Sequence, residues 1–94
     1  MGKRITHEKL GADYELVELR QRDVEAFQRD YIASVKGVET VSEKAGITVR
    51  VAAKLGLVHG LKEELVPDLP PNVVLWLSIQ IHAHVGDALK IPPL

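Results

Sequence analysis

The sequence predicts a mostly α-helical fold, a three- to four-helix bundle with a small N-terminal β-strand or hairpin. Two observations favour helices: apolar residues recur at steps of three and four over residues 22–36, and prolines introduce a long apolar segment over about 71–90. A third, a β-prone segment beside a glycine turn, favours the strands. The chain has 94 residues, so we expect a single helical domain over residues 1–94.

The N-terminal strands are expected on either side of a turn at Gly11. Residues 14–19 mix β-prone and acidic side chains, which favours a strand, and residues 3–8 are its candidate partner in a hairpin. The run Glu-Leu-Val-Glu-Leu within residues 15–19 is equally compatible with the start of a helix. Both interpretations stay open.

The first predicted helix covers residues 22–36 and ends at Gly37. Asp23 in its first turn suits the helix dipole. Its spacing places a set of apolar residues on one face: Val24, Phe27, Tyr31, Ile32 and Val35.

The middle of the chain gives clear structural signals in only some of its segments. Residues 38–45 receive no assignment, and residues 47–55 are expected to be a helix ended by Gly56. Residues 57–68 are expected to form a connector with a charged middle.

The last predicted helix, from about 71 to 90, is apolar around most of its circumference. Projected at about 100° per residue, its core face contains Val73, Val74, Leu77, Ile81, His84, Val85 and Ala88. Either neighbouring elements cover the other side, or that side binds a partner or a second subunit. So short a chain has few elements to cover two faces, which favours a binding surface with Trp76 as anchor. The candidate protein-binding residues are Leu75, Trp76, Ile79, His82 and Ala83.

Charge and composition argue against several function classes. The chain has 12 basic and 13 acidic residues, a net charge of -1, whereas nucleic-acid binding draws its affinity from a positive excess. There is no cysteine, and no apolar run is long enough to span a membrane. The first residues carry no apolar signal core, so we expect a cytoplasmic location, in the host cell if the chain is phage-encoded.

No residue pattern indicates catalysis. His82 and His84 are two apart, so on a helix they point in different directions and cannot share a metal ion. The motifs of hydrolases, phosphate-binding loops and dinucleotide-binding folds do not occur. We therefore expect no enzymatic activity, no catalytic residue, no bound metal and no cofactor.

Residues 45–57 resemble part of a helix-turn-helix, in which a Val-Ala-x-x-Leu-Gly-Leu run forms the turn. A DNA-binding regulator built on residues 41–65 is therefore an alternative function. A recognition helix should follow the turn, but Gly60 weakens it and Glu63 and Glu64 would repel phosphates. A short core helix ended by Gly56 explains the same run.

Three segments carry a resemblance to small proteins encoded in the tail-gene region of long-tailed bacteriophages and prophages, some of them tail assembly chaperones. Residues 19–27 resemble the pattern L-x-x-x-D-V-E-x-F, and residues 49–57 are similar to V-R-x-A-x-x-x-G. Residues 71–93 resemble an ending of the form P-x-V-V-x-W-L followed by I-x-x-H-I-x-x-A-L-x-I-P-P. Related chains often continue past the two prolines, whereas this sequence stops at Leu94.

The resemblance implies a non-enzymatic assembly chaperone or adaptor. Such chaperones coat an apolar helical partner, the tape-measure protein, until tail tube subunits displace them. A transient binder of apolar helices needs an exposed apolar groove of its own. An oligomeric structural subunit that associates through the last helix is a further alternative.

Overall fold

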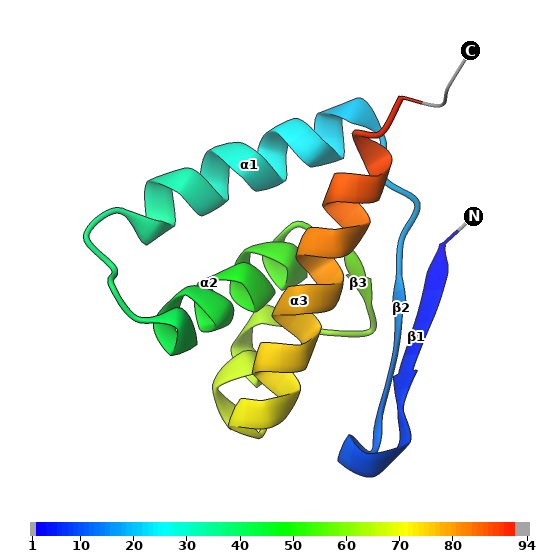
Figure 1. Ribbon diagram of the computed structural model, residues 1–94, viewed down its shortest axis with the longest axis vertical. Helices are drawn as coiled ribbons and strands as arrows, with labels where there is room; N and C mark the ends of the chain where they lie inside the picture. Colours follow the sequence, from blue (N-terminus) through cyan, green and yellow to red (C-terminus); the bar gives the residue numbers. More distant parts are fainter. Residues whose placement is uncertain (1, 92–94) are drawn as a thin grey trace.

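The computed structural model describes residues 2–91, which form helices beside a small antiparallel sheet (Figure 1). This architecture confirms the predicted fold class. The two prolines that end the phage-protein resemblance lie outside the described residues. In chain order the elements are β1 (Lys3–His7), η1 (Glu8–Leu10), β2 (Ala12–Leu16), α1 (Gln21–Val35), α2 (Val41–Lys54), β3 (Val58–His59), η2 (Glu63–Asp68) and α3 (Pro71–Ala88).

The predicted N-terminal hairpin is present, but its second strand begins and ends earlier than the expected residues 14–19. β1 and β2 pair antiparallel, from Lys3 opposite Leu16 to His7 opposite Ala12. The 3₁₀ turn η1 connects them and ends at Gly11, whose φ of 64° is a left-handed conformation that glycine adopts without strain. Side chains alternate along the strands, so that Ala12 and Leu16 are buried while the residues between them face outward or are half-buried.

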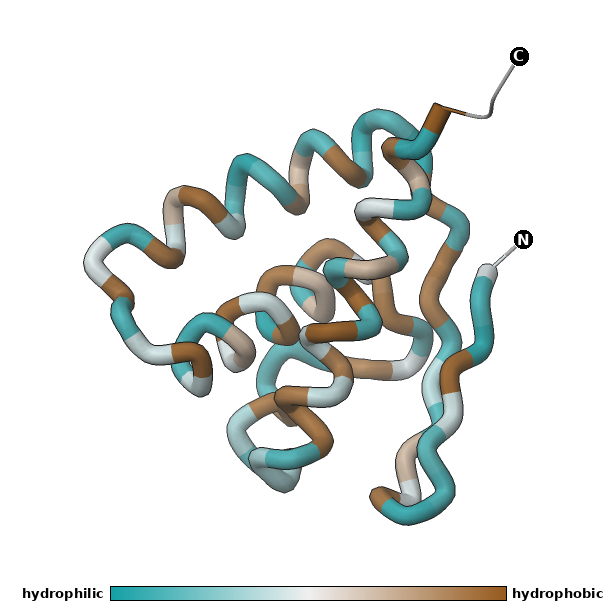
Figure 2. Tube along the Cα trace, in the orientation of Figure 1, coloured by the Kyte–Doolittle hydropathy of each residue, from teal (hydrophilic) through white to brown (hydrophobic). Residues whose placement is uncertain are grey.

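Helix α1 begins one residue before its predicted start, and the Asp23 carboxylate accepts a hydrogen bond from the Arg20 backbone N–H at 2.9 Å. Val24 and Phe27 are buried as predicted, but Ile32 is 59% exposed. Its assignment to the buried face was wrong, because it follows Tyr31 and is therefore turned by about 100° from it. Figure 2 shows hydrophilic residues over much of this helix.

Helix α2 begins at Val41, six residues before the predicted start at 47, so much of the unassigned segment is helical. Thr40 caps it, because its Oγ1 accepts from the Glu43 N–H at 3.2 Å. At the other end, the N–H groups of Gly56 and Leu57 donate to the carbonyls of Ala53 and Ala52, at 3.1 and 2.9 Å. This pattern, with glycine left-handed, closes the helix sharply.

After that closure the chain runs along the sheet. The Val17 N–H donates to the Leu57 carbonyl at 3.0 Å, and β3 then pairs with β2, so the strand order is β1-β2-β3. The predicted connector over residues 57–68 therefore contains a short third strand and the 3₁₀ helix η2, which the sequence did not indicate.

Helix α3 packs mainly against α2 and crosses the front of the molecule in Figure 1. Its inner face is buried, with Leu77 fully enclosed, while Val74 and His84 are half-buried. Ala88 is exposed and its placement in the core was wrong, since it is the last residue of the helix. Across residues 2–91, no helix is long and apolar enough to cross a membrane.

Candidate protein-binding surface

The side of α3 that faces away from the core carries exposed apolar side chains. Leu75 is 43% exposed and Ile79 is 58% exposed, and Ala83 is exposed as well. These three residues are spaced by four, so they follow one another along the helix and form what we call the outer stripe. Large apolar side chains on a helix surface are available to a partner without any change in the fold.

Trp76 lies at the edge of the outer stripe and is half-buried. Its ring packs edge-on against the His7 ring of the hairpin, with centroids 5.8 Å apart and planes 87° apart. His7 is itself held in place, because its Nδ1 accepts a hydrogen bond from the Leu10 N–H at 3.3 Å. Trp76 therefore attaches α3 to the hairpin and leaves only part of its surface for a partner.

His82 lies on the other side of the outer stripe, where α1, α2 and α3 meet. Its ring is 5.0 Å from the Tyr31 ring and 5.8 Å from the Phe27 ring, both in edge-to-face geometry. Its Nε2 is 3.0 Å from Thr48 Oγ1, whose hydroxyl donates to the Lys44 carbonyl at 2.9 Å. Since that hydroxyl has one proton, the Nε2–H of His82 must be the donor to Oγ1.

The environment of His82 favours its neutral form. Part of the residue remains open to solvent, but partial burial of the ring lowers the pKa of His82 from its ordinary value near 6.5. Its neutral ring therefore connects the three helices, and the residue borders the outer stripe instead of lying fully on it.

A wide groove adjoins the outer stripe at Leu75, between α2, η2 and the start of α3. Its volume is about 660 Å³. We call it the α2–α3 groove. Arg50 is the only charged residue among those that line it: Val41, Ser42, Ala45, Gly46, Arg50, Val66, Pro67, Leu69, Pro71, Asn72, Val74 and Leu75.

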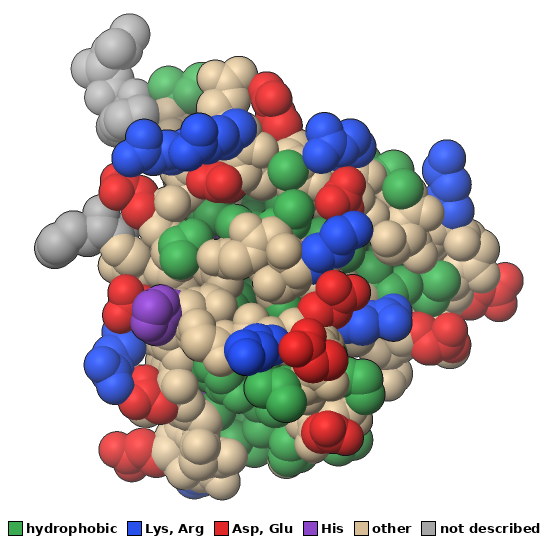
Figure 3. Space-filling model, turned by 180° about the vertical axis from the view of Figure 1, so that it is seen from behind, with side chains coloured by type: hydrophobic (Ala, Val, Ile, Leu, Met, Phe, Trp, Pro, Cys, Tyr) green, Lys and Arg blue, Asp and Glu red, His purple; other side chains and the backbone are tan. Residues whose placement is uncertain are grey.

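Figure 3 views the molecule from behind and shows hydrophobic side chains gathered at the lower end of that face. Elsewhere on the face, acidic and basic side chains are interspersed. A nucleic-acid surface needs a patch of one sign, and this face does not offer one.

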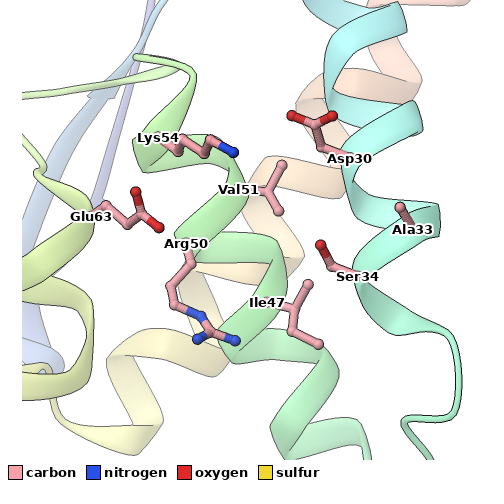
Figure 4. A pocket seen from close by; sticks show the side chains of 8 residues that line it. All are labelled: Asp30, Ala33, Ser34, Ile47, Arg50, Val51, Lys54 and Glu63. Atoms are coloured by element: carbon pink, nitrogen blue, oxygen red, sulfur yellow. The ribbon is translucent and has the colours of Figure 1, made fainter.

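A second, smaller cleft of about 330 Å³ separates α1 from α2 (Figure 4). We call it the polar cleft, because Asp30 and Lys54 extend into it from its opposite walls and Glu63 of η2 borders it. Arg50 lines both this cleft and the α2–α3 groove. Asp30 is paired with its neighbour Arg29, at 3.3 Å.

His84 has a structural role. The Nε2–H of His84 donates to the Val17 carbonyl at 2.8 Å, which ties α3 to the end of β2. Over residues 2–91, no three His, Asp or Glu residues are placed to hold a metal ion. Within the same range, every buried side-chain nitrogen and oxygen has a hydrogen-bond partner. The arrangement thus combines exposed apolar surfaces with charged groups at their margins.

Sequence reasoning identified the outer stripe but missed the groove. The groove needs Val41 and Ala45, which fall in residues 38–45, for which the sequence predicts no structure. It also needs Val66, which falls in the predicted connector, and Leu69, which follows it. One available signal was the run Thr40-Val41-Ser42-Glu43, which has the spacing of a capping box and marks a helix start.

A helix-turn-helix would have a recognition helix after Gly56, but the residues at that place adopt another structure. Residues 57–59 lie extended against β2, and Glu63 and Glu64 belong to η2. A helix suited to the DNA major groove therefore does not follow Gly56. In comparisons with family models, curated proteins and solved structures, the chain gave no match.

Proposed function

We propose that this protein is a non-enzymatic assembly chaperone or adaptor, resembling phage tail assembly chaperones, that shields an apolar helical partner such as a tape-measure protein. The observation that carries the proposal is the outer stripe. Leu75 and Ile79 are 43% and 58% exposed on a helix whose opposite face forms the core. A chaperone for apolar helices needs such a surface while its partner is absent.

The shape of the outer stripe suits a helical partner. Its residues recur every four positions, and a row of this spacing on one helix packs between the side chains of another. Trp76 and His82 border the row on its two sides and are held by His7 and Thr48. These contacts restrict both side chains before binding, which reduces the side-chain entropy that binding would otherwise cost.

The test uses two isoleucines of nearly equal exposure. Ile79 is 58% exposed on α3, and Ile32 is 59% exposed on α1. We would measure binding of a fluorescent, leucine- and alanine-rich helical peptide to Ile79→Asp, to Ile32→Asp and to the unchanged protein. Ile79→Asp should weaken binding by about tenfold or more, since one buried isoleucine contributes about 1.5–3 kcal/mol. Ile32→Asp should bind as the unchanged protein does.

Equal losses for the two variants, or no binding by the unchanged protein, would refute the proposal. Light scattering over a range of protein concentrations tests the structural-subunit alternative. A stable oligomer that Ile79→Asp dissociates, combined with no peptide binding, would assign the outer stripe to self-association.

A further inference from the structure

The α2–α3 groove has a chemical character that the outer stripe lacks. Its volume of about 660 Å³ falls within the range of about 300–1,000 Å³ typical of ligand sites. The residues that line it are apolar or uncharged except for Arg50, and the first turn of α3 adds no acidic side chain. The groove is therefore an apolar surface with a single positive charge.

Arg50 has no partner among the described residues. Its guanidinium takes part in none of the ion pairs or side-chain hydrogen bonds within residues 2–91, and the residue is exposed. Figure 4 shows its side chain directed away from Lys54 and Asp30. A guanidinium presents a planar set of donors that matches a carboxylate in a two-pronged pair. Arg50 is thus free to bind an incoming acid.

No acidic side chain lines the groove beside this charge. Glu63 lines the polar cleft, and neither Glu64 nor Asp68 lines the groove. An acidic group on a partner would meet one cation at the edge of apolar walls, where partial desolvation strengthens the attraction.

We infer that the α2–α3 groove binds a segment of a partner protein that carries two apolar side chains and an adjacent acidic residue, whose carboxylate pairs with Arg50. The occupant is a protein segment because Leu75 belongs both to the groove and to the outer stripe, so the two apolar surfaces are continuous and a protein segment can contact both. The inference rests on the proposed protein-binding function and adds a charge preference that the outer stripe alone does not supply.

The test offers the folded protein a pool of twelve-residue peptides. Each has leucines at two fixed positions, and glutamate, glutamine or lysine at a third; the other positions vary among alanine, serine and glutamine. The unchanged protein should enrich the glutamate peptides over the lysine peptides by about tenfold, because a matched charge pair beside apolar contacts is favoured and a like pair is not. Arg50→Glu should reverse the preference toward lysine.

Lys54→Glu is the matched control, since it makes the same change of charge one turn further along α2, outside the groove. It should keep the preference for glutamate. No charge preference in the unchanged protein, or the same reversal in both variants, would overturn the inference. Octanoate serves as a competitor. If it binds the protein and displaces the peptides while no peptide shows a charge preference, the groove is a site for small amphipathic acids and the inference fails.

Two further variants separate this inference from the proposed function. Val41→Asp places an acid in the groove at a residue that is 72% exposed and begins α2, where an acid is compatible with the helix. It should lose the enrichment of glutamate peptides. Ile79→Asp should keep that preference but should no longer bind the leucine- and alanine-rich helical peptide. Loss of both activities in Ile79→Asp alone would place all binding on the outer stripe.

Discussion

The two faces of α3 have similar side chains and different surroundings. Leu77 on the inner face is fully buried against α2, whereas Ile79, two residues further on, is 58% exposed. Only Ser78 separates them in the sequence of α3, and the sequence does not show which of the two is buried. The comparison shows that the apolar composition of a helix indicates how much apolar surface it has. Which face of the helix is buried depends on the neighbouring elements.

The largest effect is expected from the inner face. Leu77→Ala should lower the free energy of unfolding by about 2–5 kcal/mol, because a fully enclosed side chain leaves a cavity that its neighbours cannot fill. Urea denaturation followed by circular dichroism measures the change. A decrease in the free energy of unfolding of less than about 1 kcal/mol would show that the inner face tolerates loss of the Leu77 side chain as an exposed surface would.

An intermediate effect is expected at the boundary of the faces, where burial lowers the pKa of His82. The folded protein then favours neutral His82 more strongly than the unfolded chain does. The resulting stabilisation is complete above the ordinary pKa of about 6.5 and is lost as the pH falls through that value toward the folded pKa.

Thermal denaturation between pH 8 and pH 5 tests this dependence. The melting temperature of the unchanged protein should fall more than that of His82→Gln, whose amide retains a donor for Thr48. Identical pH profiles would mean that the ring titrates as it does in the unfolded chain. The lowered pKa values of Asp13 and Asp87 act below about 4, outside this window.

The smallest effect is expected from the outer stripe. Ile79→Gln should change the free energy of unfolding by less than about 0.5 kcal/mol, because the side chain is already mostly in water. The same urea titration measures it. A loss comparable to that of Leu77→Ala would mean that Ile79 belongs to the core and that the two faces do not differ.

The local parts of the fold were predictable and the long-range parts were not. The hairpin, α1 and α3 follow from a glycine turn, a helical period and a proline start, which are signals within one segment. The capping residue Thr40 marks the start of α2, whereas the helical period alone predicts a start at residue 47, which is six residues too late. The third strand depends on β2, more than forty residues earlier in the chain, and its two residues carry no pattern of their own.

The candidate site likewise has local features that the sequence predicts and long-range features that it does not. The helical period was enough to place Leu75 and Ile79 on one side of α3. It could not show that His7 covers part of Trp76 or that Thr48 holds His82, since both contacts join distant segments. The α2–α3 groove is formed by α2, η2 and α3, so no single segment of the sequence indicates it. Arg50 becomes a candidate binding residue only because apolar residues line the groove beside it.

The sheet has one further consequence for the protein at high concentration. β1 lies at the outer edge, so one row of its backbone N–H and C=O groups is open to a strand from another molecule. Lys3 and Arg4 occupy that strand, and the opposite edge, β3, is two residues long. Charge on one edge and brevity on the other are means by which small sheets avoid edge-to-edge aggregation. These two features of the sheet therefore disfavour polymerisation of the protein through its strands.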